Sequence, residues 1–240
     1  MKWLKADLHT HAKEDKMHVL SYTSKDLIDK AHRLKYDIIA LTFHKRVFEG
    51  EAYRKVAMYA KRKGMLLIPG CEANIEGKDT LIYNITQKEL KSIRTFRDLR
   101  QLKIDLQKKG REILVIAPHP YFSAAFMGKF CLGRKLVKNI DIFDAIEYSF
   151  LYLKRINRNK RAVKVARRYC KPMVGNGDIH VLDNLDKTYS MIYSRKTVND
   201  VIRAVKNGDI KIVTRPLTVK HVAKMAIFHS FKGKAKHKKI

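Results

Sequence analysis

Residues of the types that bind metal ions recur directly after the apolar runs of this chain. The first run leads into Asp7-Leu8-His9-Thr10-His11, where a carboxylate and two imidazoles stand at every second position. In an extended segment this spacing turns all three side chains to one face, where they can converge on one divalent ion. The same residue types follow the later apolar runs, at His44, Glu72, His119, Asp178 and His180. The sequence therefore predicts one metal site built from strand ends.

Short apolar runs alternate with longer segments of helical periodicity. The strands are expected at 38–42, 66–70, 80–85, 113–117, 143–148, 172–175, 189–193 and 210–213, and the main helices at 24–34, 51–63, 95–109, 154–170 and 197–207. Such alternation indicates a parallel sheet, and seven or eight units favour its closure into a barrel. In a βα barrel the active site lies at the carboxyl ends of the strands, where the metal-ligand types occur here.

The chain reads as one α/β domain, because Pro and Gly are sparse and no low-complexity linker divides it. We expect the barrel over residues 1–217 and a basic helix or tail over 218–240. The first strand begins almost at once, so the sequence predicts no signal peptide, and no apolar run reaches membrane-spanning length. Three widely spaced cysteines indicate no disulfide framework. These features predict a cytoplasmic protein.

The formal charge of +29 on 240 residues predicts a polyanionic partner. The charge is clustered, because neither 154–171 nor 220–239 contains an acidic residue. One basic cluster alone would suit a solvated helix face equally well. Two clusters on so basic a chain favour a nucleotide or nucleic acid.

These residues and their order resemble the PHP (polymerase and histidinol phosphatase) superfamily of metal-dependent phosphoesterases. The resemblance spans nearly the whole chain, and it is carried by Asp7-Leu8-His9-Thr10-His11, Leu41-Thr42-Phe43-His44, Gly70-Cys71-Glu72-Ala73-Asn74, Ala117-Pro118-His119-Pro120 and Gly175-Asn176-Gly177-Asp178-Ile179-His180. It implies a distorted (β/α)7 TIM-like barrel, a phosphoric ester hydrolase activity, and two or three divalent ions. An all nitrogen and oxygen ligand set suits Zn, Mn or Fe.

The resemblance also implies roles for single residues. One ion would be held by His9, His11, Glu72 and Asp178. Glu72 would bridge to a second ion held by His119, and a third ion would be held by His44, His180 and His18. Glu147 looks like a carboxylate that supports the site, although as a lone carboxylate it could equally orient backbone or a Lys. Asp7 is grouped with the catalytic residues.

Two positions depart from the family pattern. Phe43 stands where the family usually has Asp, which removes an acceptor that would orient an imidazole. The segment Thr80-Leu81-Ile82-Tyr83-Asn84 lacks the His that usually follows the Glu motif. The second departure leaves the binding of the second ion open.

The expected chemistry is attack on phosphorus by a hydroxide shared between ions, whose charge stabilises the phosphoryl oxygens. Lys45, Arg46 and Arg215, which follow predicted strands, are the candidates for binding the substrate phosphate. The expected substrates are nucleotides or oligonucleotide ends, as for a nucleoside 3′,5′-bisphosphate phosphatase or a 5′-3′ exonuclease. Two alternatives stay open: a small-molecule phosphatase of the histidinol-phosphatase type, and a non-catalytic RNA-binding barrel resembling the barrel subunit of ribonuclease P.

Overall fold

The structure is a computed structural model that describes residues 1–17, 19–121 and 129–218. Within these residues one sheet has the strand order β7-β6-β5-β4-β3-β2-β1-β8-β9. Its strands are β1 (Lys2–Thr10), β2 (Ile38–His44), β3 (Leu66–Ile75), β4 (Lys78–Tyr83), β5 (Leu114–Ala117), β6 (Ala145–Ser149), β7 (Met173–Asn176), β8 (Thr188–Ser194) and β9 (Ile210–Thr214). The helices are α1 (Ser24–Arg33), α2 (Gly50–Arg62), α3 (Gln87–Ser92), α4 (Phe96–Lys108), α5 (Arg134–Lys138), α6 (Asn159–Arg168) and α7 (Val198–Asn207). Nearly all of the predicted tail lies outside the described residues.

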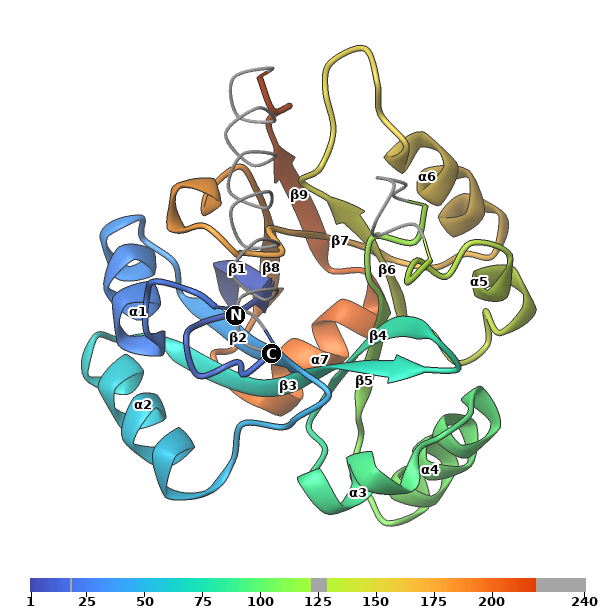
Figure 1. The fold of residues 1–240 in the computed structure, drawn as a ribbon, viewed down its shortest axis with the longest axis horizontal. Coiled ribbons are helices and arrows are strands. Elements are labelled where there is room, and N and C mark those ends of the chain that lie inside the picture. The colour runs from blue at the N-terminus through green and yellow to red at the C-terminus, as the bar shows by residue number, and fades with distance from the viewer. Residues whose placement is uncertain (18, 122–128, 219–240) are drawn as a thin grey trace, which may run out of the picture.

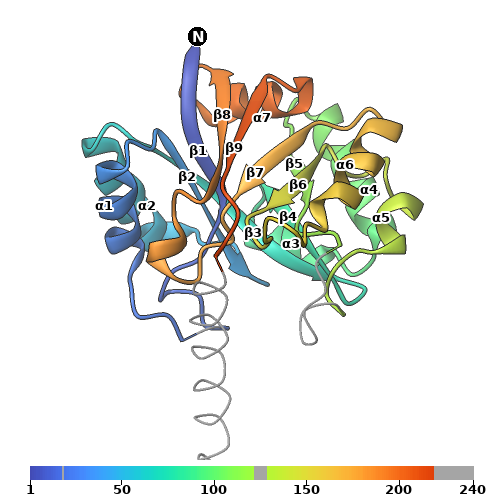
Figure 2. The same cartoon turned by 90° about the horizontal axis from the view of Figure 1, so that it is seen from above.

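The sheet curls into a nearly closed barrel, with α1 and α2 covering one side and α3 to α6 the other (Figures 1 and 2). Ser190 on β8 bridges the gap to β7: its hydroxyl donates to the Gly175 carbonyl at 3.0 Å and accepts from the Gly175 N–H at 2.9 Å. A Cβ on Gly175 would lie 2.9 Å from the Tyr189 carbonyl oxygen, so only glycine permits this approach. The prediction of an α/β barrel of the distorted TIM type is confirmed.

Two strands differ from the expected all-parallel sheet. β4 runs antiparallel to both β3 and β5, and β8 runs antiparallel to β1 and β9. The two-residue turn between β3 and β4, Glu76-Gly77, has positive φ at both positions. So short a turn can only reverse the chain, because a parallel crossover needs a dozen or more residues. The hairpin therefore replaces a βα unit at this point.

Threonines start several helices. Thr23, Thr86 and Thr95 each accept a hydrogen bond from the backbone N–H three residues later, and an acidic side chain at that position bonds back to the threonine N–H. This capping box satisfies two otherwise unpaired donors. The first of these caps, Thr23, directly precedes the helix predicted over 24–34.

The barrel interior has an apolar floor and a polar mouth. The floor is formed by side chains from β1 to β8 and from α7, including Leu4, Ile38, Leu81 and Val205. Towards the carboxyl ends of the strands the same inner face carries Glu72, which pairs with His44, and Glu147, which pairs with Val174. Charged side chains thus sit directly above the apolar core.

The barrel closure gives a stability prediction. Ser190→Ala removes both hydrogen bonds to buried Gly175, so we expect the free energy of unfolding to fall by about 1–3 kcal/mol in urea titrations. Ser194→Ala is the matched control, because Ser194 is equally buried on β8 but bonds only the carbonyl of the next residue, Arg195. Equal losses in the two variants would contradict the role of Ser190 in closure.

Candidate metal centre

A β-bulge in β1 aims the first two histidines into the barrel mouth. Asp7 pairs with Ile39 and Thr10 with Leu41, so β1 uses one residue more than β2 over this stretch. The extra residue reverses the alternation of side chains. His9 and His11 therefore face inward, whereas Asp7 leaves the strand on the other face. The prediction that all three share one face is wrong for Asp7 for this reason.

Glu72, at the centre of the mouth, is surrounded by imidazoles. One of its oxygens, Oε2, lies 3.3 Å from His9 Nε2, 3.4 Å from His11 Nε2 and 3.1 Å from His44 Nε2. The other oxygen, Oε1, lies 3.2 Å from His119 Nε2. A carboxylate placed in this way can bridge metal ions.

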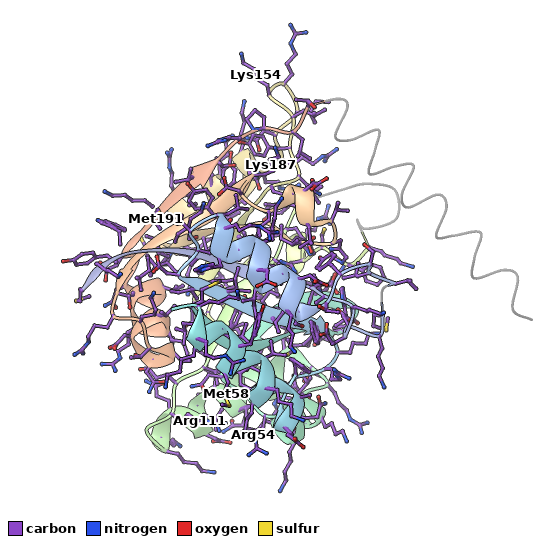
Figure 3. The ribbon with its side chains drawn as sticks, turned by 90° about the vertical axis from the view of Figure 1, so that its left-hand side faces the viewer. Arg54, Met58, Arg111, Lys154, Lys187 and Met191 are labelled. Atoms are coloured by element: carbon purple, nitrogen blue, oxygen red, sulfur yellow. The ribbon has the colours of Figure 1, made fainter. Side chains whose placement is uncertain are left out.

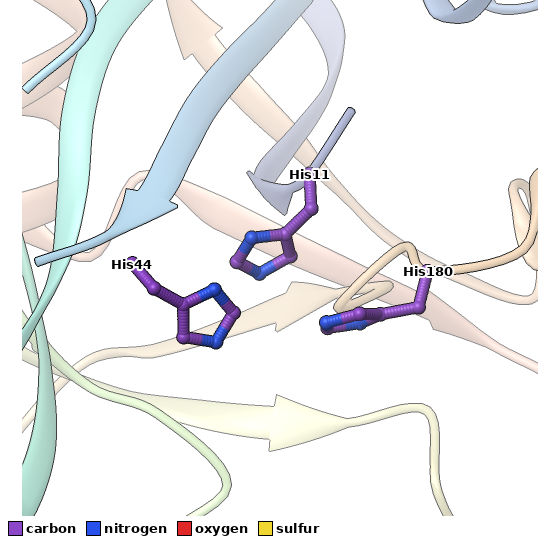
Figure 4. Close-up of side chains that lie close together, drawn as sticks. All are labelled: His11, His44 and His180. Atoms are coloured by element: carbon purple, nitrogen blue, oxygen red, sulfur yellow. The ribbon is translucent and has the colours of Figure 1, made fainter. Parts of the chain in front are cut away.

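Asp178 closes the opposite side of the cluster. Its Oδ1 lies 3.4 Å from His9 Nε2, 3.5 Å from His11 Nε2 and 3.2 Å from His180 Nδ1. The rings of His11, His44 and His180 face one another across the mouth (Figure 4). The side chains form three groups whose ligand atoms lie close enough together to hold one ion each. These groups are His9, His11 and Asp178; His9, Glu72 and His119; and His11, His44 and His180.

Carboxylates behind the rings fix their orientation. Glu147 accepts from His9 Nδ1 at 2.9 Å. Asp15 Oδ2 accepts from His11 Nδ1 at 2.9 Å and from His44 Nδ1 at 2.7 Å. These bonds direct the Nε2 lone pairs of all three rings into the cluster, as metal-binding histidines require.

Neighbouring opposite charges keep buried groups of the site ionised. Burial opposes protonation of His11, but Asp15, Asp178 and Glu72 outweigh it and raise its pKa to about 10. Burial likewise disfavours ionised Glu72, yet His9 and His44 hold the pKa of that carboxyl well below its usual range. Protons therefore partly balance the carboxylates, and a divalent ion can replace them.

The donor set fits a divalent metal. Two buried atoms that point into the cluster, His11 Nε2 and Asp178 Oδ1, have no hydrogen-bond partner among the described residues. Buried polar atoms are normally satisfied, so these two are the atoms expected to bind an ion. Imidazole and carboxylate together suit Zn, Mn or Fe rather than a structural zinc bound by thiolates.

Strained backbone places two of the candidate ligands. The backbone φ angle is 27° at His119 and 42° at Asp178, values that residues other than glycine rarely adopt. Gly177, which precedes Asp178, is also constrained, because a Cβ there would lie 2.5 Å from Asp7 Oδ2. Such strain is typical of functional sites.

The remaining predicted site residues lie outside the three ligand groups. The carboxylate of Asp7 accepts from the N–H groups of His9 and Gly177 and so supports backbone, while burial raises its pKa to about 7. His18 lies outside the described residues. Lys45 and Arg215 are exposed, and Arg46 donates to the carbonyl of Glu14. Phosphate binding by these three cations stays a prediction.

Sequence reasoning missed Asp15, which supports two rings at once. Its signal was weak but present, because Asp15 follows His11 by four residues in a short polar loop. It also supplies the acceptor that Phe43 cannot offer.

A second acid, Asp79 on β4, pairs with Asn74 on the face that carries Glu72. Burial and the negative charge of Glu72 raise the pKa of Asp79 to about 6.

Comparisons with known proteins agree with the PHP resemblance. A family model described as PHP-associated matches residues 157–210. A two-domain protein from Bacteroides vulgatus containing a predicted PHP-like metal-dependent phosphoesterase has a similar structure, with 16% identity, a TM-score of 0.64, and coverage of 89% of this chain and 65% of that one. The chain thus spans less than two thirds of that protein. No curated protein sequence matches the chain.

Two other structures share the fold. PsfC from Pseudomonas syringae is 17% identical, with a TM-score of 0.64 and coverage of 96% of this chain and 99% of that one. The lesion-specific endonuclease PfuEndoQ from Pyrococcus furiosus is 13% identical, with a TM-score of 0.55 and coverage of 93% and 66%. At these identities the likeness shows the fold alone. No described helix is long and apolar enough to cross a membrane.

The support by Asp15 can be tested through metal affinity. Asp15→Asn keeps the shape of the side chain but weakens its acceptance from two rings, so we expect the affinity for Mn²⁺ or Zn²⁺ to fall about 10–100-fold. Competition with a chelator measures this loss. Asp141→Asn, on an exposed pair with Arg100, is the control. Unchanged affinity in Asp15→Asn would contradict the assignment.

The raised histidine pKa values predict how the metal-free protein responds to pH. A pKa of about 10 for His11 means that its stabilisation is complete below about pH 6.5 and is lost as the pH rises towards 10. Between pH 7 and 9 we expect the free energy of unfolding of the wild type to fall, relative to His11→Gln, by up to about 1.4 kcal/mol per pH unit. Urea titrations at each pH measure this difference. Parallel pH profiles would show that His11 is not protonated in the fold.

Proposed function

We propose that this protein is a metal-dependent phosphoesterase that acts on nucleotides or oligonucleotide ends. The observation that carries the proposal is the convergence of imidazoles on the shared carboxylate of Glu72, with His11 Nε2 and Asp178 Oδ1, neither of which forms a hydrogen bond with a described residue, beside it. The agreement with PHP-like phosphoesterase and endonuclease folds supports the reaction class.

The chain's own residues supply binding and orientation. His9, His11, Glu72 and Asp178 would hold a first ion, and His119 and Glu72 would hold a second. His44 and His180, with His11, would hold a third. Bound ions would activate water and neutralise phosphoryl charge. Because Asp15 and Glu147 accept from Nδ1 of the rings, Nε2 would be the nitrogen that binds an ion once its proton is displaced.

The substrate class is inferred from charge and from one structural relative. The net charge of +29 favours polyanions, and the similar fold of PfuEndoQ is that of an endonuclease. A small phosphate monoester needs the same ions but no extended basic surface. Salt therefore separates the two, because kcat/KM for an oligonucleotide should fall steeply with salt and that for a small monoester only weakly.

Activity and metal content test the proposal together. Wild-type protein reconstituted with Mn²⁺ or Zn²⁺ should bind about two or more equivalents and release phosphate or nucleotides from nucleoside 3′,5′-bisphosphate or short 5′-phosphorylated oligonucleotides. The His9→Ala/Asp178→Ala variant should lose both the metal and the activity. Metal-loaded wild type that leaves all of these substrates intact would refute the proposed function. Protein that never binds these ions would favour the RNA-binding alternative.

A further inference from the structure

A small hollow of about 10 Å³ lies beside His119 of the metal centre, and a larger open hollow adjoins it along α6. The part nearest the centre is lined by His119, Ser149 and Arg158, among others. It shares Tyr121 and Arg158 with an open hollow of about 400 Å³. We call this second hollow the basic trough, and its lining consists of Tyr121, Asn157, Arg158, Lys160, Arg161 and Lys164.

The cations of the trough have no acidic partners. Arg158, Lys160, Arg161 and Lys164 are exposed, and none makes an ion pair with a described residue. No acidic residue lines the trough. Like charges gathered on one face repel one another, so an anionic ligand stabilises the arrangement.

Helix α6 adds to this positive field. Its first turn carries no acid, whereas the first turns of α1, α4 and α7 carry Asp26, Asp98 and Asp200. The positive end of the α6 dipole thus lies at Arg158 without a side chain that neutralises it.

The start of α6 is fixed to the strand that supports the metal centre. Asn159 accepts from the Ser149 N–H at 3.0 Å and donates to the Ser149 carbonyl at 2.8 Å. Ser149 ends β6, and Glu147 on the same strand holds His9. These links give the trough a defined position relative to His9 and His119.

The dimensions and surface of the trough suit a strand rather than a single phosphate. The ten residues of α6 span about 15 Å, and phosphates along a nucleic-acid strand are spaced by roughly 3.4 Å or more. The Arg161 guanidinium lies 4.4 Å from the centroid of the Tyr121 ring. A flat Arg and aromatic pair is a surface on which bases stack in single-strand binding proteins.

We propose that the basic trough binds the sugar-phosphate backbone of a single nucleic-acid strand, and that this strand leads its end into the metal centre past Arg158. The direction of the strand rests on the proposed function, but binding in the trough does not. The protein then prefers oligonucleotides over mononucleotides and over small phosphate monoesters.

Binding to metal-free full-length protein tests the trough without any need for activity. The probe is a single-stranded thymidine octanucleotide with a 3′ fluorescein, and its anisotropy gives Kd over a series of salt concentrations. For Arg161→Gln/Lys164→Gln, two lost phosphate contacts should weaken binding and reduce the slope of log Kd against log salt by about 1.4. Arg161→Lys keeps the charge and should keep the slope.

The matched control removes the same charge from another face. Arg54 and Lys61 are exposed on α2 and form no ion pair with a described residue. Arg54 lies at the opposite end of the molecule from Lys154, which precedes the trough (Figure 3). Arg54→Gln/Lys61→Gln should therefore leave the slope unchanged. Equal slopes in all variants, or equal losses in both double variants, would overturn the proposal.

Kinetics separate this proposal from the proposed function. If the enzyme hydrolyses both p-nitrophenyl phosphate and the 5′-phosphorylated octanucleotide, Arg161→Gln/Lys164→Gln should lower kcat/KM only for the octanucleotide. Equal kcat/KM losses on both substrates would contradict the proposal that the trough binds a nucleic-acid strand. If the metal-loaded wild type hydrolyses neither substrate, the proposed function fails. The anisotropy measurement still shows whether the trough binds a nucleic-acid strand.

Discussion

The carboxylate of Glu72 is buried among four imidazoles at the barrel mouth, and the geometry around it depends on how that charge is compensated. Removing an ionised carboxylate from water costs several kcal/mol unless opposite charge and hydrogen bonds offset the loss. Here the offset comes from His9, His11, His44 and His119, whose rings lie within 3.4 Å of its oxygens. In the metal-free protein the raised pKa values of His9, His11 and His119 allow protons to supply positive charge, and in the loaded protein divalent ions can supply it. The site is therefore built for exchange between protons and metal.

The fold provides the rigid frame for this exchange. The ligands come from five strands: His9 and His11 from β1, His44 from β2, Glu72 from β3, His119 from the end of β5, and Asp178 and His180 from the end of β7. These strands rest on an apolar floor closed by α7. The bulge in β1 turns His9 and His11 inward, and the strained residues His119 and Asp178 point their side chains where regular strand geometry would not. Asp15 and Glu147 then fix the rings from behind. The ligand atoms are thus held in place before any ion binds.

Local pattern was enough to predict the strands, the barrel and the convergence of the ligand residues, because apolar runs and the residue type after each run are short-range features. It failed where long-range geometry decides. The face of Asp7 depends on a bulge relative to β2. The reversal of β4, by contrast, follows from the local turn at Glu76-Gly77, which the expectation of a parallel sheet passed over. The support by Asp15 depends on a loop that folds back over His11 and His44. The clustering of basic residues near 154–171 was visible, but only the fold shows that Arg158 adjoins His119.

The most direct test of the account is anomalous X-ray diffraction from crystals of the protein loaded with Mn²⁺. We predict manganese peaks inside the barrel mouth, beside Glu72, His11 Nε2 and Asp178 Oδ1. The absence of any peak at Glu72 in crystals soaked at saturating Mn²⁺ and neutral pH would contradict the central claim that this cluster is a metal centre.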